Sequence, residues 1–139
     1  MTPELDLVGL VVADLPASLR FYRDLGLPVP EPSDDVDHVE VTCANGLRLA
    51  WDSEQLVRSF DPDFRAEGRS RPGLAFRLPD AAAVDATAER MASAGHRVHR
   101  APWDAFWGQR YAQLLDPDGV NVDLFADLDR PDQLPPGSV

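Results

Sequence analysis

Apolar and polar positions in the first part of the chain follow two different periods. Residues 7–12 (LVGLVV) form a short, β-branched apolar run, which is typical of a buried strand. From residue 16 to residue 25 the apolar side chains recur at helical spacing. Asp14 supplies an N-cap, Pro16 suits a first helical turn, and Gly26 follows as a terminator. The pattern therefore predicts a strand and then a helix over 16–25.

The next segment predicts three strands and a short helix. Residues 27–33 are rich in proline and permit only a short edge strand. Residues 36–42 and 47–51 flank the Asn-Gly pair at 45–46, which is the strongest short hairpin signal. Residues 53–60 are expected to form a short helix, and the polar loop that follows has the composition of a linker.

The same order of elements then returns. Asp80 and Gly95 mark the ends of a second helix, and the Pro- and Gly-containing turn 116–119 (DPDG) joins the last two strands. The expected elements are a strand over 73–78, a helix over 81–94, and strands over 96–101, 110–115 and 120–125. Two similar halves of about 60 residues indicate an internal duplication.

These elements predict an α+β fold built from two βαβββ modules. We expect a single domain over residues 1–128, with module one at about 5–66 and module two at about 67–128. The C-terminal tail over 129–139 contains three prolines and is expected to fray.

Strand alternation separates cavity-facing residues from residues that face the helices. On the last strand, Asn121 and Asp123 share the small or polar side. The expected register of the closing hairpin places Ala112 opposite Asp123, with Arg110 diagonally near Asp123 on the same face. A slip by one residue would move this whole set to the other face.

The first hairpin is treated in the same way. A two-residue turn at 45–46 places Cys43 opposite Arg48 and Val41 opposite Ala50. We expect these residues to join the cavity wall.

Composition narrows the class of function. The net charge of −11 disfavours nucleic-acid backbones, and it either attracts a cationic ligand or simply promotes solubility. The single cysteine, Cys43, excludes an internal disulfide framework and fits a reducing compartment. No apolar run approaches the roughly 20 residues that span a bilayer, and no signal-peptide pattern is present. We therefore expect a cytoplasmic protein that binds neither nucleic acid nor membrane.

The segment 7–26 (LVGLVVADLPASLRFYRDLG) resembles the opening of the vicinal oxygen chelate superfamily, which includes glyoxalase I, extradiol dioxygenases and bleomycin-resistance proteins. Residues 107–111 (WGQRY) and the DPDG turn resemble its closing hairpin, so the resemblance covers about residues 5–126. It implies two modules whose curled mixed sheets form a cleft, and it implies a homodimer in which a second subunit often completes that cleft. One fold carries many activities, so the motifs specify fold better than function.

In metal-dependent members of this superfamily, His or Glu side chains on four strands hold a divalent cation. The resemblance places these ligand positions at Leu7, Ala50, Gly73 and Asp123, of which only the last has a donor atom. Catalytic metal sites typically use three or more protein ligands. The chain is therefore interpreted as a metal-free member without a cofactor, while a displaced site that uses His38 or His96 stays an alternative.

Asp123 is the best single candidate for ligand binding, and for catalysis if there is any. A carboxylate on an otherwise apolar strand either accepts a hydrogen bond from a ligand or is neutralised by Arg110 or Arg48. Trp103 is a candidate for stacking on a planar or cationic ligand, and Trp107 is a structural or ligand-facing neighbour. Phe60 is either part of a lid or an anchor of its loop. The full set of ligand-binding candidates is Asp123, Arg110, Trp103, Trp107, Arg48, Val41, Ala50 and Phe60.

The sequence thus favours a metal-independent protein that sequesters or carries a small organic ligand in a cleft. The alternative is an enzyme of the same superfamily. It would be either a metal-dependent lyase or dioxygenase with a displaced site, or a metal-free isomerase with Asp123 as base. A further alternative is an interaction module without a ligand.

Overall fold

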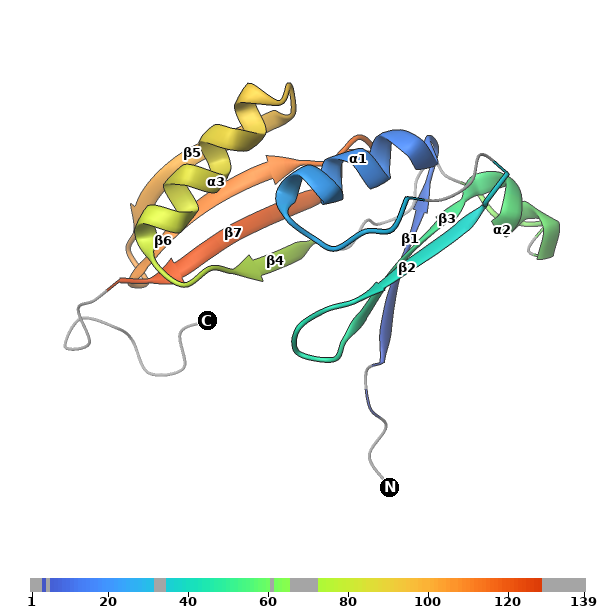
Figure 1. Ribbon diagram of the computed structural model, residues 1–139, viewed down its shortest axis with the longest axis horizontal. Helices are drawn as coiled ribbons and strands as arrows, with labels where there is room; N and C mark the ends of the chain where they lie inside the picture. Colours follow the sequence, from blue (N-terminus) through green and yellow to red (C-terminus); the bar gives the residue numbers. More distant parts are fainter. Residues whose placement is uncertain (1–3, 5, 32–34, 61, 66–72, 129–139) are drawn as a thin grey trace. The chain divides into compact units, whose positions relative to one another are not determined.

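The computed structural model describes residues 4, 6–31, 35–60, 62–65 and 73–128. The chain divides into two compact units, residues 1–70 and residues 71–139. Each unit has its own sheet, and together they make the α+β fold that the sequence predicts (Figure 1). No helix in the described ranges is long and apolar enough to cross a bilayer.

Unit 1 is a three-stranded mixed sheet with two helices. Its strands pair in the order β1-β3-β2, with β1 parallel and β2 antiparallel to β3. Its elements are β1 (Leu7–Val12), α1 (Leu15–Leu25), β2 (His38–Thr42), β3 (Arg48–Ser53) and α2 (Glu54–Phe60).

Helix α1 has the boundaries that its capping residues dictate. The Asp14 carboxylate accepts a hydrogen bond from the Ala17 backbone N–H at 3.1 Å, and Gly26 ends the helix with φ of 117°. The buried side of α1 packs on β3, where the rings of Tyr22 and Trp51 lie 5.1 Å apart. This packing fixes which face of the first sheet is apolar.

The edge strand expected over 27–33 is absent from the described part of that segment. Residues 27–31 are irregular, and residues 32–34 lie outside the described residues. Instead of a neighbouring strand, the Arg23 guanidinium donates to the carbonyls of Val29 and Pro30 at 3.4 and 3.0 Å. The prolines of this segment have no backbone N–H, so it cannot form a regular ladder of strand hydrogen bonds. The Arg23 side chain supplies the donors for its carbonyl oxygens instead.

The first hairpin has a three-residue loop, not the two-residue turn expected. The Cys43 N–H donates to Leu47 O at 2.8 Å, and the Gly46 N–H donates to Cys43 O at 2.9 Å, with Gly46 at φ of 90°. Val41 therefore pairs with Leu49, so the predicted pairing of Val41 with Ala50 is wrong. Val41 is buried on the helix side of the sheet, and it does not join the opposite face.

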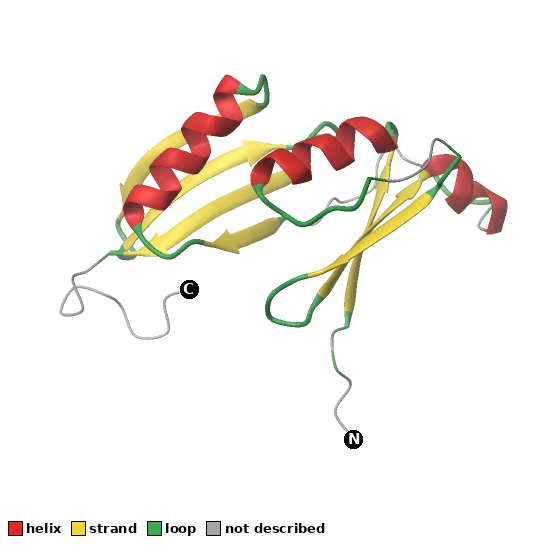
Figure 2. Cartoon of the chain, viewed as in Figure 1, coloured by secondary structure: helices red, strands yellow, loops and turns green. Residues whose placement is uncertain are grey.

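Unit 2 is a four-stranded sheet with one helix. Strands pair in the order β4-β7-β6-β5, with β4 parallel to β7 and the other pairs antiparallel. Helix α3 covers one face of this sheet (Figure 2), and its contacts are with β5, β6 and β7. The elements are β4 (Leu74–Arg77), α3 (Ala81–Ser93), β5 (Arg97–Ala105), β6 (Gln109–Leu115) and β7 (Asn121–Asp127).

The closing hairpin deviates from its expected register in the same way. Asp116 pairs with Val120 across a three-residue loop, and the Asp116 Oδ1 accepts the backbone N–H groups of Asp118 and Val120, both at 2.9 Å. Gln113, not Ala112, therefore lies opposite Asp123. The slip by one residue moves Arg110 to the helix side of the sheet, away from the face of Asp123.

Candidate functional site

Asp123 lies in the middle of the face of the unit 2 sheet that α3 leaves uncovered. Its neighbours across the ladder are Ala75 on β4 and Gln113 on β6. The Tyr111 hydroxyl donates to Asp123 Oδ2 at 2.7 Å. The second carboxylate oxygen, Oδ1, is buried and has no hydrogen-bond partner among the described residues. A buried acceptor without a donor is costly, so a hydrogen bond from a water molecule or from a ligand would stabilise this oxygen.

Aromatic rings surround the Tyr111 side of Asp123. The Tyr111 ring centroid lies 5.4 Å from the Trp103 ring and 5.4 Å from the Trp107 ring, both in edge-to-face arrangement. On its other side Phe125 stacks on it at 6.2 Å. We call this set, Trp103, Trp107, Tyr111, Phe125 and Asp123, the Asp123 face.

A chain of polar contacts fixes one border of the Asp123 face. The Trp107 indole N–H donates to Gln109 Oε1, and Gln109 Nε2 donates to Asp127 Oδ1, both at 2.9 Å. Arg77 completes the chain by donating to Asp127 Oδ2 at 2.9 Å. The hydrogen bond from Gln109, followed by the one from Arg77, lowers the pKa of Asp127. Trp107 is thus held in place by the fold.

Burial and the hydrogen bond to Asp123 act in the same direction on Tyr111. Burial, and then the bond to the Asp123 carboxylate, raise the pKa of the Tyr111 phenol. Tyr111 is therefore a neutral donor to Asp123 at physiological pH.

Arg110 does not neutralise Asp123, contrary to the expected diagonal contact. Its guanidinium donates to Asp85 on α3 at 2.7 and 2.8 Å and to Asp104 on β5 at 2.5 Å. The hydrogen bonds from Arg110 to these two carboxylates, that to Asp104 first, raise its pKa. Arg110 is thus part of an ion-pair network on the helix side of the sheet.

Four other candidates lie in unit 1. Arg48 donates to Asp6 at 2.6 Å and to Glu40 at 2.8 Å, and these hydrogen bonds, that to Asp6 first, raise its pKa. Ala50 is buried. Phe60 is exposed at the end of α2, and Val41 packs on the helix side, as described above.

Tyr111, the direct partner of Asp123, was not among the predicted site residues. It lies in the WGQRY segment, two residues from Gln113, so it shares the face of Asp123 only in the observed register. Trp103, expected in a loop, lies instead within β5 opposite Tyr111. A correct loop length for the closing hairpin would have placed Tyr111 on the face of Asp123, whereas the position of Trp103 depends on β5, which extends through Ala105.

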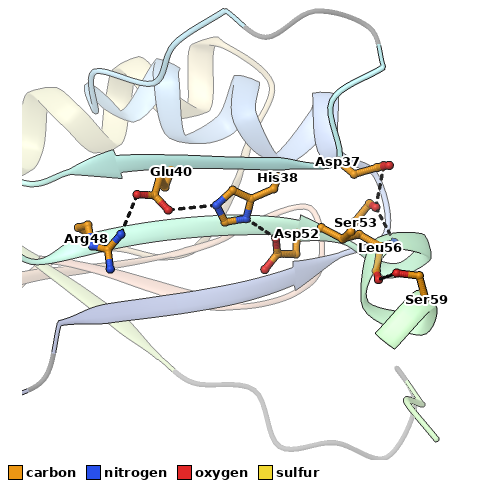
Figure 3. Close-up of polar contacts among 8 residues, drawn as sticks. All are labelled: Asp37, His38, Glu40, Arg48, Asp52, Ser53, Leu56 and Ser59. Atoms are coloured by element: carbon orange, nitrogen blue, oxygen red, sulfur yellow. Dashed lines mark hydrogen bonds and ion pairs between the residues drawn. The ribbon is translucent and has the colours of Figure 1, made fainter. Parts of the chain in front are cut away.

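The corresponding face of the unit 1 sheet carries a network of charged side chains (Figure 3). His38 hydrogen-bonds through Nδ1 with Asp52 and through Nε2 with Glu40, the latter at 3.0 Å. The bond to Asp52, and then the bond to Glu40, raise the pKa of His38. Arg48 donates to the other oxygen of Glu40, so His38, Asp52, Glu40 and Arg48 are each paired with another member of the network.

Two surface hollows lie away from the Asp123 face. In unit 1 a hollow of about 530 Å³ lies beside the first turn of α1 and is lined in part by Asp14, Arg23 and Asp37. In unit 2 a hollow of about 470 Å³ lies between α3 and β5 and is lined mainly by small apolar side chains, including Ala88, Ala101 and Val98. Among the described residues, neither hollow is lined by a buried polar side chain that lacks a hydrogen-bond partner.

The two units, with their parallel-antiparallel sheets and the carboxylate on the last strand, define the class of two-module α+β proteins described above. A family model for the Glyoxalase/Bleomycin resistance protein/Dioxygenase superfamily matches residues 4–124. The chain belongs to this superfamily. A separate comparison with curated proteins found no match.

Solved structures support the fold along the whole chain. A glyoxalase/bleomycin resistance protein/dioxygenase from Nocardioides is 26% identical, with a TM-score of 0.76 over 100% of this chain and 91% of that chain. A glyoxalase/bleomycin resistance protein/dioxygenase family enzyme from Burkholderia phytofirmans is 19% identical, with a TM-score of 0.76 over 91% of this chain and 100% of that chain. A lactoylglutathione lyase from Agrobacterium tumefaciens is 22% identical, with a TM-score of 0.67 over 90% and 94% of the two chains.

The metal that some members of this superfamily bind does not fit the residues present here. Leu7 and Ala50 lie on the polar face of the unit 1 sheet but have aliphatic side chains, and Gly73 has none. In the described part of the chain, no group of three or more His, Cys, Asp or Glu side chains is arranged to hold a metal ion. This includes His38, whose ring nitrogens are engaged by carboxylates.

Proposed function

We propose that this protein binds a small organic molecule on the Asp123 face without the help of a metal ion. The proposal rests on one observation above all, the buried Asp123 Oδ1, which has no hydrogen-bond donor in the part of the chain that the structure describes. A ligand that donates to this oxygen would remove the cost of leaving it unpaired. Binding sites for small molecules commonly combine apolar and aromatic walls with a few such polar groups.

The aromatic rings supply the remaining contact area. Trp103 and Trp107 lie 6.2 Å apart in an edge-to-face arrangement, and both are half-buried, so part of each ring is accessible. A flat ligand that stacks on Trp103 brings its edge toward Tyr111 and Asp123. The resulting function is sequestration or transport of a small, partly aromatic molecule.

Replacement of Trp103 tests the aromatic contact. Aromatic fragments such as indole and quinoline are titrated against the protein, and binding is followed by tryptophan fluorescence and by the indole N–H signals in NMR. We expect Trp103→Ala to weaken binding by about tenfold, or ~1.4 kcal/mol. Phe106→Ala is the matched control, because Phe106 is 92% exposed and contacts Trp107 only from the turn. Equal affinities of Trp103→Ala and the wild-type protein would contradict the proposal.

The pair of Tyr111 and Asp123 favours one second function, a metal-free isomerase. A carboxylate with one oxygen held by a phenol and the other unpaired has the arrangement of a general base with a neighbouring acid. Deuterium uptake from D₂O into small α-hydroxy ketones measures such proton transfer. Uptake that disappears in Asp123→Asn, while fragment binding persists, would favour the enzyme over the binding protein.

The expected homodimer and the cytoplasmic location belong to the same proposal. Sedimentation at several protein concentrations measures the oligomeric state directly. A monomer across the whole range would remove the homodimer from the proposal and leave the Asp123 face unaffected.

A further inference from the structure

We infer that the ligand of the Asp123 face is a planar ring that carries a cationic N–H group of the amidinium kind, and that Tyr111 orients the carboxylate that selects it. This inference rests on the proposed function and adds the chemical class of the ligand.

The acceptor oxygens of Asp123 and Tyr111 determine which hydrogen-bonding groups the ligand must carry. An ionised carboxylate can only accept, so the group that reaches Asp123 Oδ1 must be a donor. The Tyr111 hydroxyl gives its proton to Oδ2, so the Tyr111 oxygen also presents only lone pairs to a ligand. A group with two N–H donors in one plane matches these two neighbouring acceptors.

The surroundings of the Asp123 carboxylate indicate the charge of the ligand. No cationic side chain in the described residues pairs with the Asp123 carboxylate. Arg77 is bound to Asp127, Arg110 to Asp85 and Asp104, and Arg97 to the Asp116 carbonyl. A charge-assisted hydrogen bond is stronger than a neutral one, so a cationic donor gains most from this carboxylate.

The face of the Trp103 ring already contacts a planar cation. Arg100 on β5 places its guanidinium carbon 3.6 Å from the centroid of the Trp103 ring. This arrangement demonstrates that the ring face accepts a planar cation. Arg100 is exposed, so it occupies the ring face as an internal competitor that a planar cationic ligand displaces.

Access to Oδ1 requires only a local movement. The Asp123 side chain is half-buried, while its Oδ1 is fully covered. The terminal torsion of an aspartate is broad, so we expect a small rotation of the carboxylate on ligand binding to bring this oxygen to the surface. The bond from Tyr111 limits that rotation, and Tyr111 is therefore a positioning residue.

The experiment compares three probes that share one ring and differ in charge, namely benzamidine, benzamide and benzoate. Calorimetry on the whole protein should give the order benzamidine, benzamide, benzoate, with about tenfold between the first two. Asp123→Asn should abolish this preference, and Tyr111→Phe should reduce the ratio of affinities more than it reduces binding of benzamide. Asp85→Asn is the matched control: Asp85 lies on α3, on the other side of the sheet, where Arg110 binds both of its oxygens, and we expect it to keep the preference.

The Arg100→Ala variant tests whether Arg100 competes with the ligand for the Trp103 ring. Removal of the internal competitor in Arg100→Ala should tighten benzamidine binding severalfold, whereas Arg97→Ala on the same strand should not. The inference is overturned if benzamide or benzoate binds as tightly as benzamidine, if none of the three binds, or if Arg100→Ala weakens benzamidine binding. Binding of benzoate that Trp103→Ala abolishes would overturn the ligand class alone and keep the proposed function. Asp123→Asn and Tyr111→Phe are nearly isosteric, and the order of the probes on the wild-type protein tests the inference even if a variant does not fold.

Discussion

The two oxygens of Asp123 have different surroundings, and the difference comes from one neighbour. Tyr111 satisfies Oδ2, while Oδ1 is buried without a donor. His38 in unit 1 is the opposite case, because both of its ring nitrogens have carboxylate partners. At the scale of single residues, one oxygen of Asp123 has no donor among the described residues, whereas both ring nitrogens of His38 are hydrogen-bonded.

His38 leads to a prediction about pH. Its pKa is raised in the folded protein, mainly by the bond to Asp52. The stabilising contribution is therefore fully present below the unfolded value of about 6.5, and it is lost as the pH rises through the raised folded value. NMR titration of the His38 ring should give a pKa above 6.5 that falls in Asp52→Asn. The difference in unfolding free energy between wild type and His38→Ala should shrink over the same pH range, and a difference that grows with pH would refute this account.

Asp116 leads to a prediction about stability. Its side chain is fully buried, and Oδ1 accepts two backbone N–H groups of the closing turn. Asp116→Ala leaves both donors without this partner, so we expect a loss of about 2–4 kcal/mol in unfolding free energy. Asp116→Asn retains an acceptor oxygen and should lose clearly less. Denaturant unfolding of both variants measures the difference, and equal losses would show that the hydrogen bonds do not carry the effect.

At the scale of elements, the three β-hairpins of the described residues use the same kind of connection. Each has a three-residue loop that ends in a glycine with positive φ, Gly46 at 90°, Gly108 at 92° and Gly119 at 82°. An added Cβ at Gly46 or at Gly119 meets no heavy atom within 4 Å, so the constraint at these two positions is purely conformational.

The glycine of each loop can be tested separately. Gly46→Ala and Gly119→Ala should each destabilise the protein by about 1–2 kcal/mol, because an L-residue pays this amount in the left-handed region. Gly9→Ala is the control, since its φ is not positive and its Cβ would lie at an ordinary 3.7 Å from Leu7. Thermal unfolding compares the three variants. A loss for Gly9→Ala as large as for the loop glycines would argue against the conformational explanation.

These loops also determine how much the sequence could predict. Alternation along the last strand correctly separated Asp123 from the helix-facing residues, and the capping residues located α1 and α3 within a residue or two. The Asn-Gly and DPDG motifs predicted the positions of the two hairpins but not the lengths of their loops. A difference of one residue in loop length shifts the register by one, and every side chain of one strand then lies on the other face relative to its partner strand. This is why Val41 and Arg110 were assigned to the wrong faces and Tyr111 was overlooked.

At the scale of the whole molecule, three of the four positions that hold the metal in metal-dependent relatives are Leu7, Ala50 and Gly73, which have no donor side chain. We expect elemental analysis of the purified protein to find far less than one transition-metal ion per chain. A chelator should leave both Tm and fragment binding unchanged. A stoichiometric metal that is lost on chelation, with a fall in Tm, would contradict the metal-free proposal.

The charge network of the unit 1 sheet has a consequence for how that face can change by mutation. His38, Glu40, Asp52 and Arg48 are each bound to another charged side chain, so replacement of one of them leaves its partner unpaired. The uncovered face of unit 2 differs, because Asp123 Oδ1 has no donor among the described residues. A single substitution that supplies a donor there would add an interaction without breaking an existing one, so the binding preference of this face could change in one step.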